Sequence, residues 1–174
     1  MDFAKLMPDF NAIGKTNWAK PQLDTKDLIG LAGIIAAGIM IVLVFTPWFG
    51  YEVTGFRGLF SESSTRFGIT LWYGILGFIV AIATLACHLY NHKALALWCS
   101  TFCLLMGLIG LFAYSDVTRS DGYITTAEVI KYNVARGSAD TIRWGVILYI
   151  LFAMLSAASA FMTAMNIKIK SNKI

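Results

Sequence analysis

The stretch TPWFGYEVTGFRGLF, residues 46–60, interrupts a chain that is apolar on both sides of it. An apolar run ends at Pro47 and Trp48, and apolar and polar side chains then alternate over residues 51–56. Alternation of this kind predicts a half-exposed β-strand. The sequence SESST at residues 61–65 indicates a turn, after which residues 67–70 lead into the next apolar run. We therefore predict a small β-hairpin between two long apolar segments.

The composition around this stretch is that of a membrane protein. Hydrophobic residues make up 57% of the 174 residues and charged residues only 14%, whereas about a quarter of the residues in soluble domains are charged. The first residues have no short apolar core with a cleavage site, so we expect no signal peptide. We expect the lipid bilayer as a partner and, because no basic cluster accompanies the net charge of +4, no nucleic acid.

Four apolar blocks are long enough to cross a bilayer as helices, which takes about 20 residues. They are residues 28–48, 69–90, 94–114 and 145–167, and none contains Asp, Glu, Lys or Arg. Backbone groups in the hydrocarbon core must be hydrogen-bonded internally, which forces helix there. We predict an all-α integral membrane fold: a four-helix transmembrane bundle over residues 28–167, with Asp24 or Thr25 capping the first helix. The aromatic residues at the span ends predict a belt at the membrane surface: Trp48, Trp72, Tyr73, Tyr90, Tyr114 and Trp144.

Lysine placement predicts the orientation. An even number of spans puts both termini on one side, and that side carries eight lysines against six basic residues on the other. This bias predicts cytoplasmic termini in a plasma (inner) membrane. Residues 168–174 then form a basic cytoplasmic tail. Residues 1–27 form an amphipathic cytoplasmic segment that lies in the membrane interface, docks on a neighbour, or is a partly ordered arm because of Pro8.

The two outer loops are predicted to contain structure. A lone hairpin is barely stable in water, so the first loop must rest on the second loop or on another protein. In the second loop, Thr125 and Glu128 match a capping box and Gly137 a helix stop, which predicts a short helix near residues 126–135. All five arginines lie on this side, either as a solvated surface or as a docking surface that pairs with carboxylates of a partner: Arg57, Arg66, Arg119, Arg136 and Arg143.

Candidates for chemistry are few. His88 and His92 stand four residues apart, a spacing that can serve a metal or haem, but the chain has no further histidine. We favour interfacial histidines near lipid headgroups, whose joint replacement leaves folding intact, and expect no cofactor. Cys87 is predicted to lie close to Cys99 across the tight hairpin between the second and third spans, and buried cysteines of this kind are usually inert.

Small residues recur every four positions in the fourth span, at Ser156, Ala160 and Ala164. Such a stripe lets membrane helices approach closely. It can bind a partner subunit, which is our prediction for these residues, or pack the protein's own bundle.

Four spans, cytoplasmic termini, Trp48 at the start of a strand-like outer loop and Gly-Leu-Phe at residues 58–60 resemble the claudin and peripheral-myelin-protein group. Members of that group carry a second Trp where this chain has Phe60, and two loop cysteines that this chain lacks. The resemblance implies a left-handed four-helix bundle with a small outer sheet. It does not carry over a junction-forming role.

The spans contain no interior proline and no Asp, Glu, Lys or Arg, which argues against a transporter or channel, because such pathways are marked by ionisable residues or broken helices. We therefore expect a non-catalytic accessory or structural subunit of a larger membrane protein complex. One alternative is a claudin-like self-associating or adhesion protein. Another is a membrane redox or lipid-modifying enzyme subunit that uses the two histidines or the cysteines.

Overall fold

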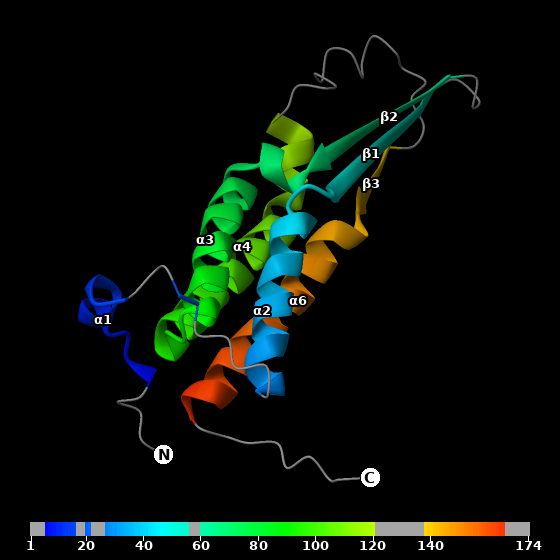
Figure 1. The fold of residues 1–174 in the computed structure, drawn as a ribbon. Helices are drawn as coiled ribbons and strands as arrows, with labels where there is room; N and C mark the ends of the chain where they lie inside the picture. The colour runs from blue at the N-terminus through cyan, green and yellow to red at the C-terminus, as the bar shows by residue number, and fades with distance from the viewer. Residues whose placement is uncertain (1–5, 17–19, 22–26, 56–59, 121–137, 166–174) are drawn as a thin grey trace, which may run out of the picture.

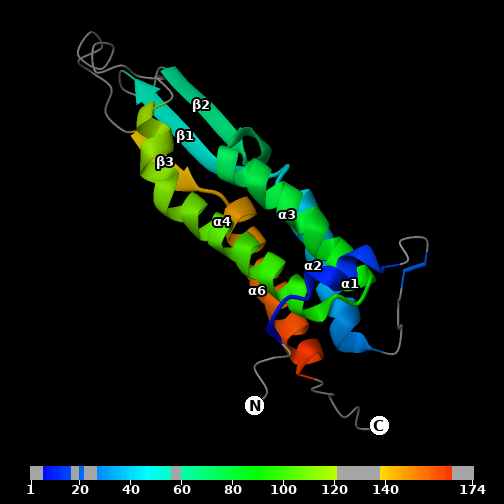
Figure 2. The same ribbon diagram turned by 90° about the vertical axis from the view of Figure 1, so that its left-hand side faces the viewer.

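A helical bundle with a small β-sheet at one end makes up the fold (Figure 1). The structure, a computed structural model, describes residues 6–16, 20–21, 27–55, 60–120 and 138–165. The long helices are α2 (Leu28–Leu43), α3 (Trp72–Leu89), α4 (Lys93–Ser120) and α6 (Trp144–Ala164). A short helix, α1 (Phe10–Gly14), lies at the end of the bundle away from the sheet (Figures 1 and 2).

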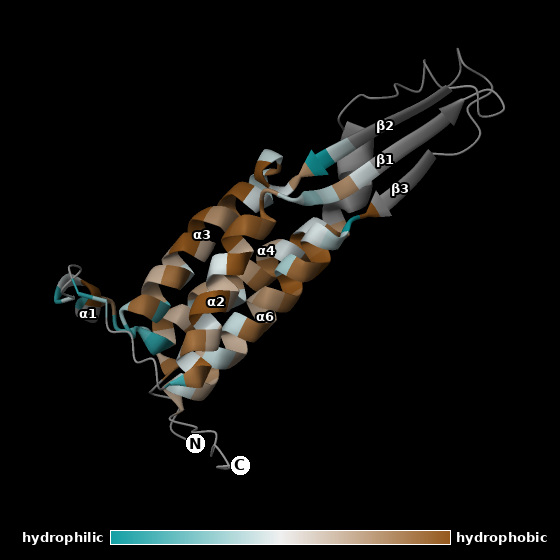
Figure 3. Cartoon of the chain, turned by 45° about the vertical axis from the view of Figure 1, so that its right-hand side comes forward, coloured by the Kyte–Doolittle hydropathy of each residue, from teal (hydrophilic) through white to brown (hydrophobic). Residues whose placement is uncertain are grey.

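The long helices pack in a closed ring, with α2 against α3 and α6, and α4 against α3 and α6. Alanines at the contacts, including Ala37, Ala81 and Ala153, have no exposed surface, which allows close approach of the helix backbones. The helices are mostly hydrophobic (Figure 3), and many of their large apolar side chains are exposed. Within the described residues, three helices are long and apolar enough to cross a membrane: residues 72–89, 93–112 and 144–164. This confirms the prediction of a mainly helical protein with membrane-length helices.

We predicted helix throughout the first apolar block, residues 28–48, but the structure is helical over only part of it. Helix α2 ends at Leu43, and the chain turns at residues 44–46 before entering a strand at Pro47. Proline has no amide hydrogen to donate and disfavours helical geometry in the residue before it, so the block ends as a strand. The cap is Asp27, whose carboxylate accepts a hydrogen bond from the Gly30 amide (3.2 Å), and not Asp24 or Thr25.

The predicted hairpin is present: β1 (Pro47–Gly55) pairs antiparallel with β2 (Phe60–Phe67). The prediction of a turn at residues 61–65 is wrong, because these residues belong to β2, with Ser64 opposite Tyr51. A strand outside the hydrophobic core is held by backbone hydrogen bonds and does not need alternating apolar side chains, so its polar sequence concealed it.

A third strand supports the hairpin. Residues 138–142 form β3 (Ser138–Ile142), which pairs antiparallel with the other side of β1, so the sheet order is β2-β1-β3. Of the two supports that we considered for the hairpin, the second outer loop is therefore the one observed. The short helix predicted near residues 126–135 lies outside the described residues.

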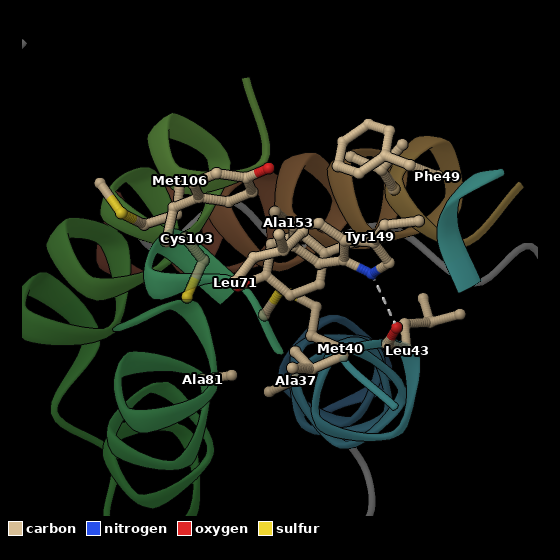
Figure 4. Close-up of a cluster of buried hydrophobic side chains, with 14 residues drawn as sticks. Ala37, Met40, Leu43, Phe49, Leu71, Ala81, Cys103, Met106, Tyr149 and Ala153 are labelled. Carbon is tan, nitrogen blue, oxygen red and sulfur yellow. Dashed lines mark hydrogen bonds between the residues drawn. The ribbon is translucent and has the colours of Figure 1, made fainter. Parts of the chain in front are cut away.

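Trp48 occupies an irregularity in the sheet and fills the core of the bundle. The register between β1 and β2 shifts between Pro47 and Phe49, and such bulges re-aim a side chain. The Trp48 indole is fully buried and donates a hydrogen bond to the Leu43 carbonyl (2.9 Å), the dashed line at Leu43 in Figure 4. Its ring centroid lies 5.1 Å from that of Tyr149 and 6.1 Å from that of Tyr73.

This aromatic core corrects part of the predicted belt. Trp48 and Tyr73 are 0% and 1% exposed, so they stabilise the interior and do not face a membrane surface. Trp72 and Trp144, by contrast, are 61% and 75% exposed, as the belt requires. Sequence position marks a span end, but it does not show whether an aromatic ring points inward or outward.

Candidate functional site

A buried polar cluster links three helices in the part of the bundle away from the sheet. Nε2 of His88 on α3 lies 3.0 Å from Oγ of Ser156 on α6. Ser156 Oγ lies 2.8 Å from Oγ of Ser100 on α4, and Ser100 donates to the Ala96 carbonyl (2.7 Å). Both serines are fully buried. The cluster thus joins α3, α6 and α4 in one chain of hydrogen bonds.

The hydrogen atoms that each group can donate give the chain of hydrogen bonds a direction. The Ser100 hydroxyl has one hydrogen, and a carbonyl oxygen can only accept, so that hydrogen points to Ala96. Ser100 must then accept from the Ser156 hydroxyl, whose single hydrogen is thereby used. When all three contacts are hydrogen bonds at once, His88 donates to Ser156 from a protonated Nε2. The direction runs from His88 through Ser156 and Ser100 to the Ala96 carbonyl.

Helix α2 is the fourth helix that packs against the cluster. The Ser159 hydroxyl donates to the carbonyl of Ile29. A Cβ atom at Gly33 would lie 2.5 Å from Ser159 Oγ and 2.8 Å from Nδ1 of His88. Glycine is therefore required for α2 to pack against the imidazole.

The proton order restricts what the cluster can do chemically. A serine beside a histidine is the core of nucleophilic catalysis, but the histidine must accept the serine proton. Here His88 donates to Ser156, and the Ser156 side chain is inaccessible to solvent. Among the described residues, no three His, Cys, Asp or Glu side chains are grouped as metal ligands. The arrangement acts as a hydrogen-bonded lock that fixes how the helices pack.

A spacing of four residues puts two side chains on one face of a continuous helix, but His88 and His92 do not share a helix. Helix α3 ends at Leu89, and Asn91 adopts a left-handed conformation (φ 59°) that turns the chain. His88 therefore points into the bundle, while His92 lies beyond the turn with Nε2 2.8 Å from Oγ1 of Thr16. The polar partner of His88 is thus Ser156, 68 positions away in the chain, and the position of His88 near lipid headgroups stays a prediction.

We expect His88→Ala to lower the free energy of unfolding by about 1–3 kcal/mol, because the buried Ser156 oxygen loses the hydrogen bond from His88. His92→Ala is the control, since His92 contacts Thr16 and lies outside the buried polar cluster. Thermal melting of both variants in mild detergent measures the difference. Equal melting temperatures for the two variants contradict the assignment of His88 to a structural lock.

The small-residue stripe of α6 lies inside the protein's own bundle. Ser156 and Ala160 are 0% exposed and Ala164 is 7% exposed. Ser156 takes part in the polar cluster, and Ala160 packs with Ala96 and Cys87. The stripe therefore packs the protein's own bundle. The prediction that it binds a partner subunit is wrong, because these residues have almost no exposed surface.

The cysteines behave as small apolar residues. Cys87 and Cys99 pack in the same cluster with Ala96 and Ala160, as expected from their positions across the hairpin. Cys103 is fully buried on α4, where its thiol lies 3.9 Å from Thr84 Oγ1. All three are free thiols.

Two of the five arginines proposed for partner binding have described side chains. Arg143, just before α6, is exposed, and its guanidinium packs against the backbone of Gly50 in β1. Arg66 is half-buried in β2. Arg57 and Arg136 lie outside the described residues, as does the side chain of Arg119.

Sequence reasoning missed Ser100, Ser159 and Gly33 as members of the polar cluster. A signal was available, because a hydroxyl in an apolar span must find a hydrogen-bond partner. Which partner it finds depends on helix rotation and on long-range packing. The contacts join residues 68 and 56 positions apart in the chain.

The length and composition of α3, α4 and α6, with the sheet outside the bundle, place the chain in the class of helical membrane proteins. Comparison of the chain with protein-family models, with curated proteins and with solved structures found no match.

Proposed function

We propose that the protein is a four-span membrane protein with cytoplasmic termini that serves as a non-catalytic accessory subunit of a larger membrane complex. The fourth span in this proposal is α2. Its 16 residues cover only about 24 Å as a helix, less than the roughly 30 Å of a hydrocarbon core. Its exposed apolar side chains, Leu28, Ile35, Val42 and Phe45, nevertheless extend from its start to just past its end.

The observation that carries the accessory role is the three-stranded sheet. It stands beyond the bundle, at the end opposite α1 (Figure 1). Within the described residues, β2 pairs with β1 on one side only. An edge strand of this kind offers backbone donors and acceptors to a strand of another chain. We infer that a partner subunit docks on this edge.

A photo-crosslinking residue at Thr65, an exposed position in β2, tests the proposal in intact membranes and after purification in mild detergent. The matched control carries the same group at Ile79, on the apolar outer face of α3. Crosslinks at Thr65 to a different, co-purifying membrane protein support the accessory role. Crosslinks only to a second copy favour the claudin-like alternative, to which the same open edge is suited. A protein that purifies alone and crosslinks to nothing overturns both.

The enzyme alternative named the two histidines or the cysteines, and the structure adds one pair to test, His88 and Ser156. It requires Ser156 to lose its proton to His88, against the order of the hydrogen-bond chain. A lipophilic fluorophosphonate, which labels activated serines, should therefore leave Ser156 unmodified in the folded protein. Labelling of the folded protein that is lost in Ser156→Ala establishes the enzyme alternative instead.

The orientation has its own test. A cysteine introduced at Ser171, in the lysine-rich tail, should resist a membrane-impermeant thiol reagent added to intact cells. A cysteine at Thr65 should react, because it lies on the sheet side. Equal labelling of both positions contradicts cytoplasmic termini.

A further inference from the structure

Hydrogen bonds at the start of α4 attach the amino-terminal segment to the bundle. The Trp98 indole donates to the carbonyl of Leu6 (3.0 Å), although the two residues are 92 positions apart. Oγ1 of Thr16 lies 2.8 Å from Nε2 of His92. These contacts hold the described residues 6–16, including α1, beside the end of the bundle away from the sheet (Figures 1 and 2).

Large apolar side chains of this segment remain uncovered. Met7 is 71% exposed and Phe10 is 65% exposed, and the indole that attaches the segment, Trp98, is 55% exposed. Met7 lies before α1 and Phe10 begins it, and a segment with its apolar side chains turned outward is typical of insertion into the membrane interface. Tryptophan is likewise enriched at that level.

The attachment point sets a depth that fits such an interface. Trp98 follows Lys93, the first residue of α4, by five positions, which is about 8 Å along a helix axis. Interfacial helices bury their apolar face about 5–10 Å into the boundary between headgroups and acyl chains. A lysine at headgroup level therefore places Trp98, and the segment bound to it, at that boundary.

Charge decides between two ways of binding a membrane. Residues 1–27 contain four lysines and four aspartates, so their net charge is zero. Attraction to anionic lipids therefore contributes little, and apolar insertion must supply the binding.

We propose that residues 6–16 form an interfacial anchor that inserts Met7 and Phe10 into the headgroup–acyl boundary of the bilayer around the bundle. This inference rests on the membrane topology in the proposed function, but not on the accessory role. The anchor fixes the level of the bundle in the membrane at the end away from the sheet.

The test places the fluorophore NBD on single cysteines at Phe10 or at Asn11, an exposed polar neighbour on the same helix. The three native cysteines are replaced by alanine, and each variant must keep the parent's melting temperature. The proteins are reconstituted into phosphatidylcholine vesicles with or without lipids that carry a nitroxide on the headgroup. We expect blue-shifted emission and strong quenching at Phe10, weaker quenching at Asn11, and no change in either when salt is raised.

Trp98→Phe keeps an aromatic ring but removes the donor to Leu6, and we expect it to reduce the quenching at Phe10. Water-like emission at Phe10 overturns the proposal. Blue-shifted emission that lipid nitroxide does not quench also overturns it, because the segment is then covered by protein. Failure of the accessory role appears only in the crosslinking at Thr65 and leaves these signals unchanged.

Discussion

Trp48→Ala is expected to lower the free energy of unfolding by about 3–5 kcal/mol, the usual cost of truncating a buried aromatic side chain. The indole is 0% exposed, packs between Tyr73 and Tyr149, and donates to the Leu43 carbonyl. Its removal leaves a cavity where the sheet meets the bundle and deletes the hydrogen bond that ties β1 to α2. Unfolding by SDS titration from mild detergent measures the effect.

Trp144→Ala is the matched control. Trp144 begins α6 and is 75% exposed, so the same substitution there creates no internal cavity. We expect a change below about 1 kcal/mol, as for most substitutions away from buried contacts. Comparable losses for the two variants contradict the placement of Trp48 in the core and restore its assignment to the membrane-surface belt.

Gly33→Leu should be the most damaging substitution in the buried polar cluster. Its Cβ would lie 2.5 Å from Ser159 Oγ and 2.8 Å from His88 Nδ1, and both neighbours are held by hydrogen bonds. Overpacking of this kind costs about 1–3 kcal/mol, occasionally more. The clash outweighs the roughly 0.8–1 kcal/mol that a helix gains when glycine is replaced by a good helix former.

Gly38→Leu on the same helix separates these two contributions. A Cβ at Gly38 meets no atom within 4 Å, so only the gain in helix propensity remains. We expect Gly38→Leu to be neutral or stabilising and Gly33→Leu to be strongly destabilising in the same SDS titration. A Gly33→Leu protein as stable as the parent is incompatible with the packing of α2 against His88.

Patterns over a few neighbouring residues predicted the elements that depend only on those residues. Long runs without charge indicated the helices, because a buried backbone must satisfy its own hydrogen bonds. Alternation after Trp48 indicated β1. The same reasoning failed for β2, whose polar sequence resembles a turn, and for the end of α2, where the apolar run continues past Leu43 into β1.

The candidate site could be predicted only in part. His88 and Ser156 were noticed for their spacing and small size, and each was assigned a surface role. Their contact joins α3 to α6 across 68 positions, and nothing in the sequence near either residue indicates the other. Ser100 and Ser159 attracted no attention, because a single hydroxyl in an apolar run has many possible partners.

The sequence by itself determined the class of the protein and the order of its long helices, because hydrophobicity and backbone hydrogen bonding act over a few residues. Only the tertiary structure decided which side chains point inward. It turned Trp48 into the core, brought β3 beside β1, and directed His88 to Ser156. Each of these depends on the rotation of a helix or the register of a strand, which is set by packing against residues far away in the chain.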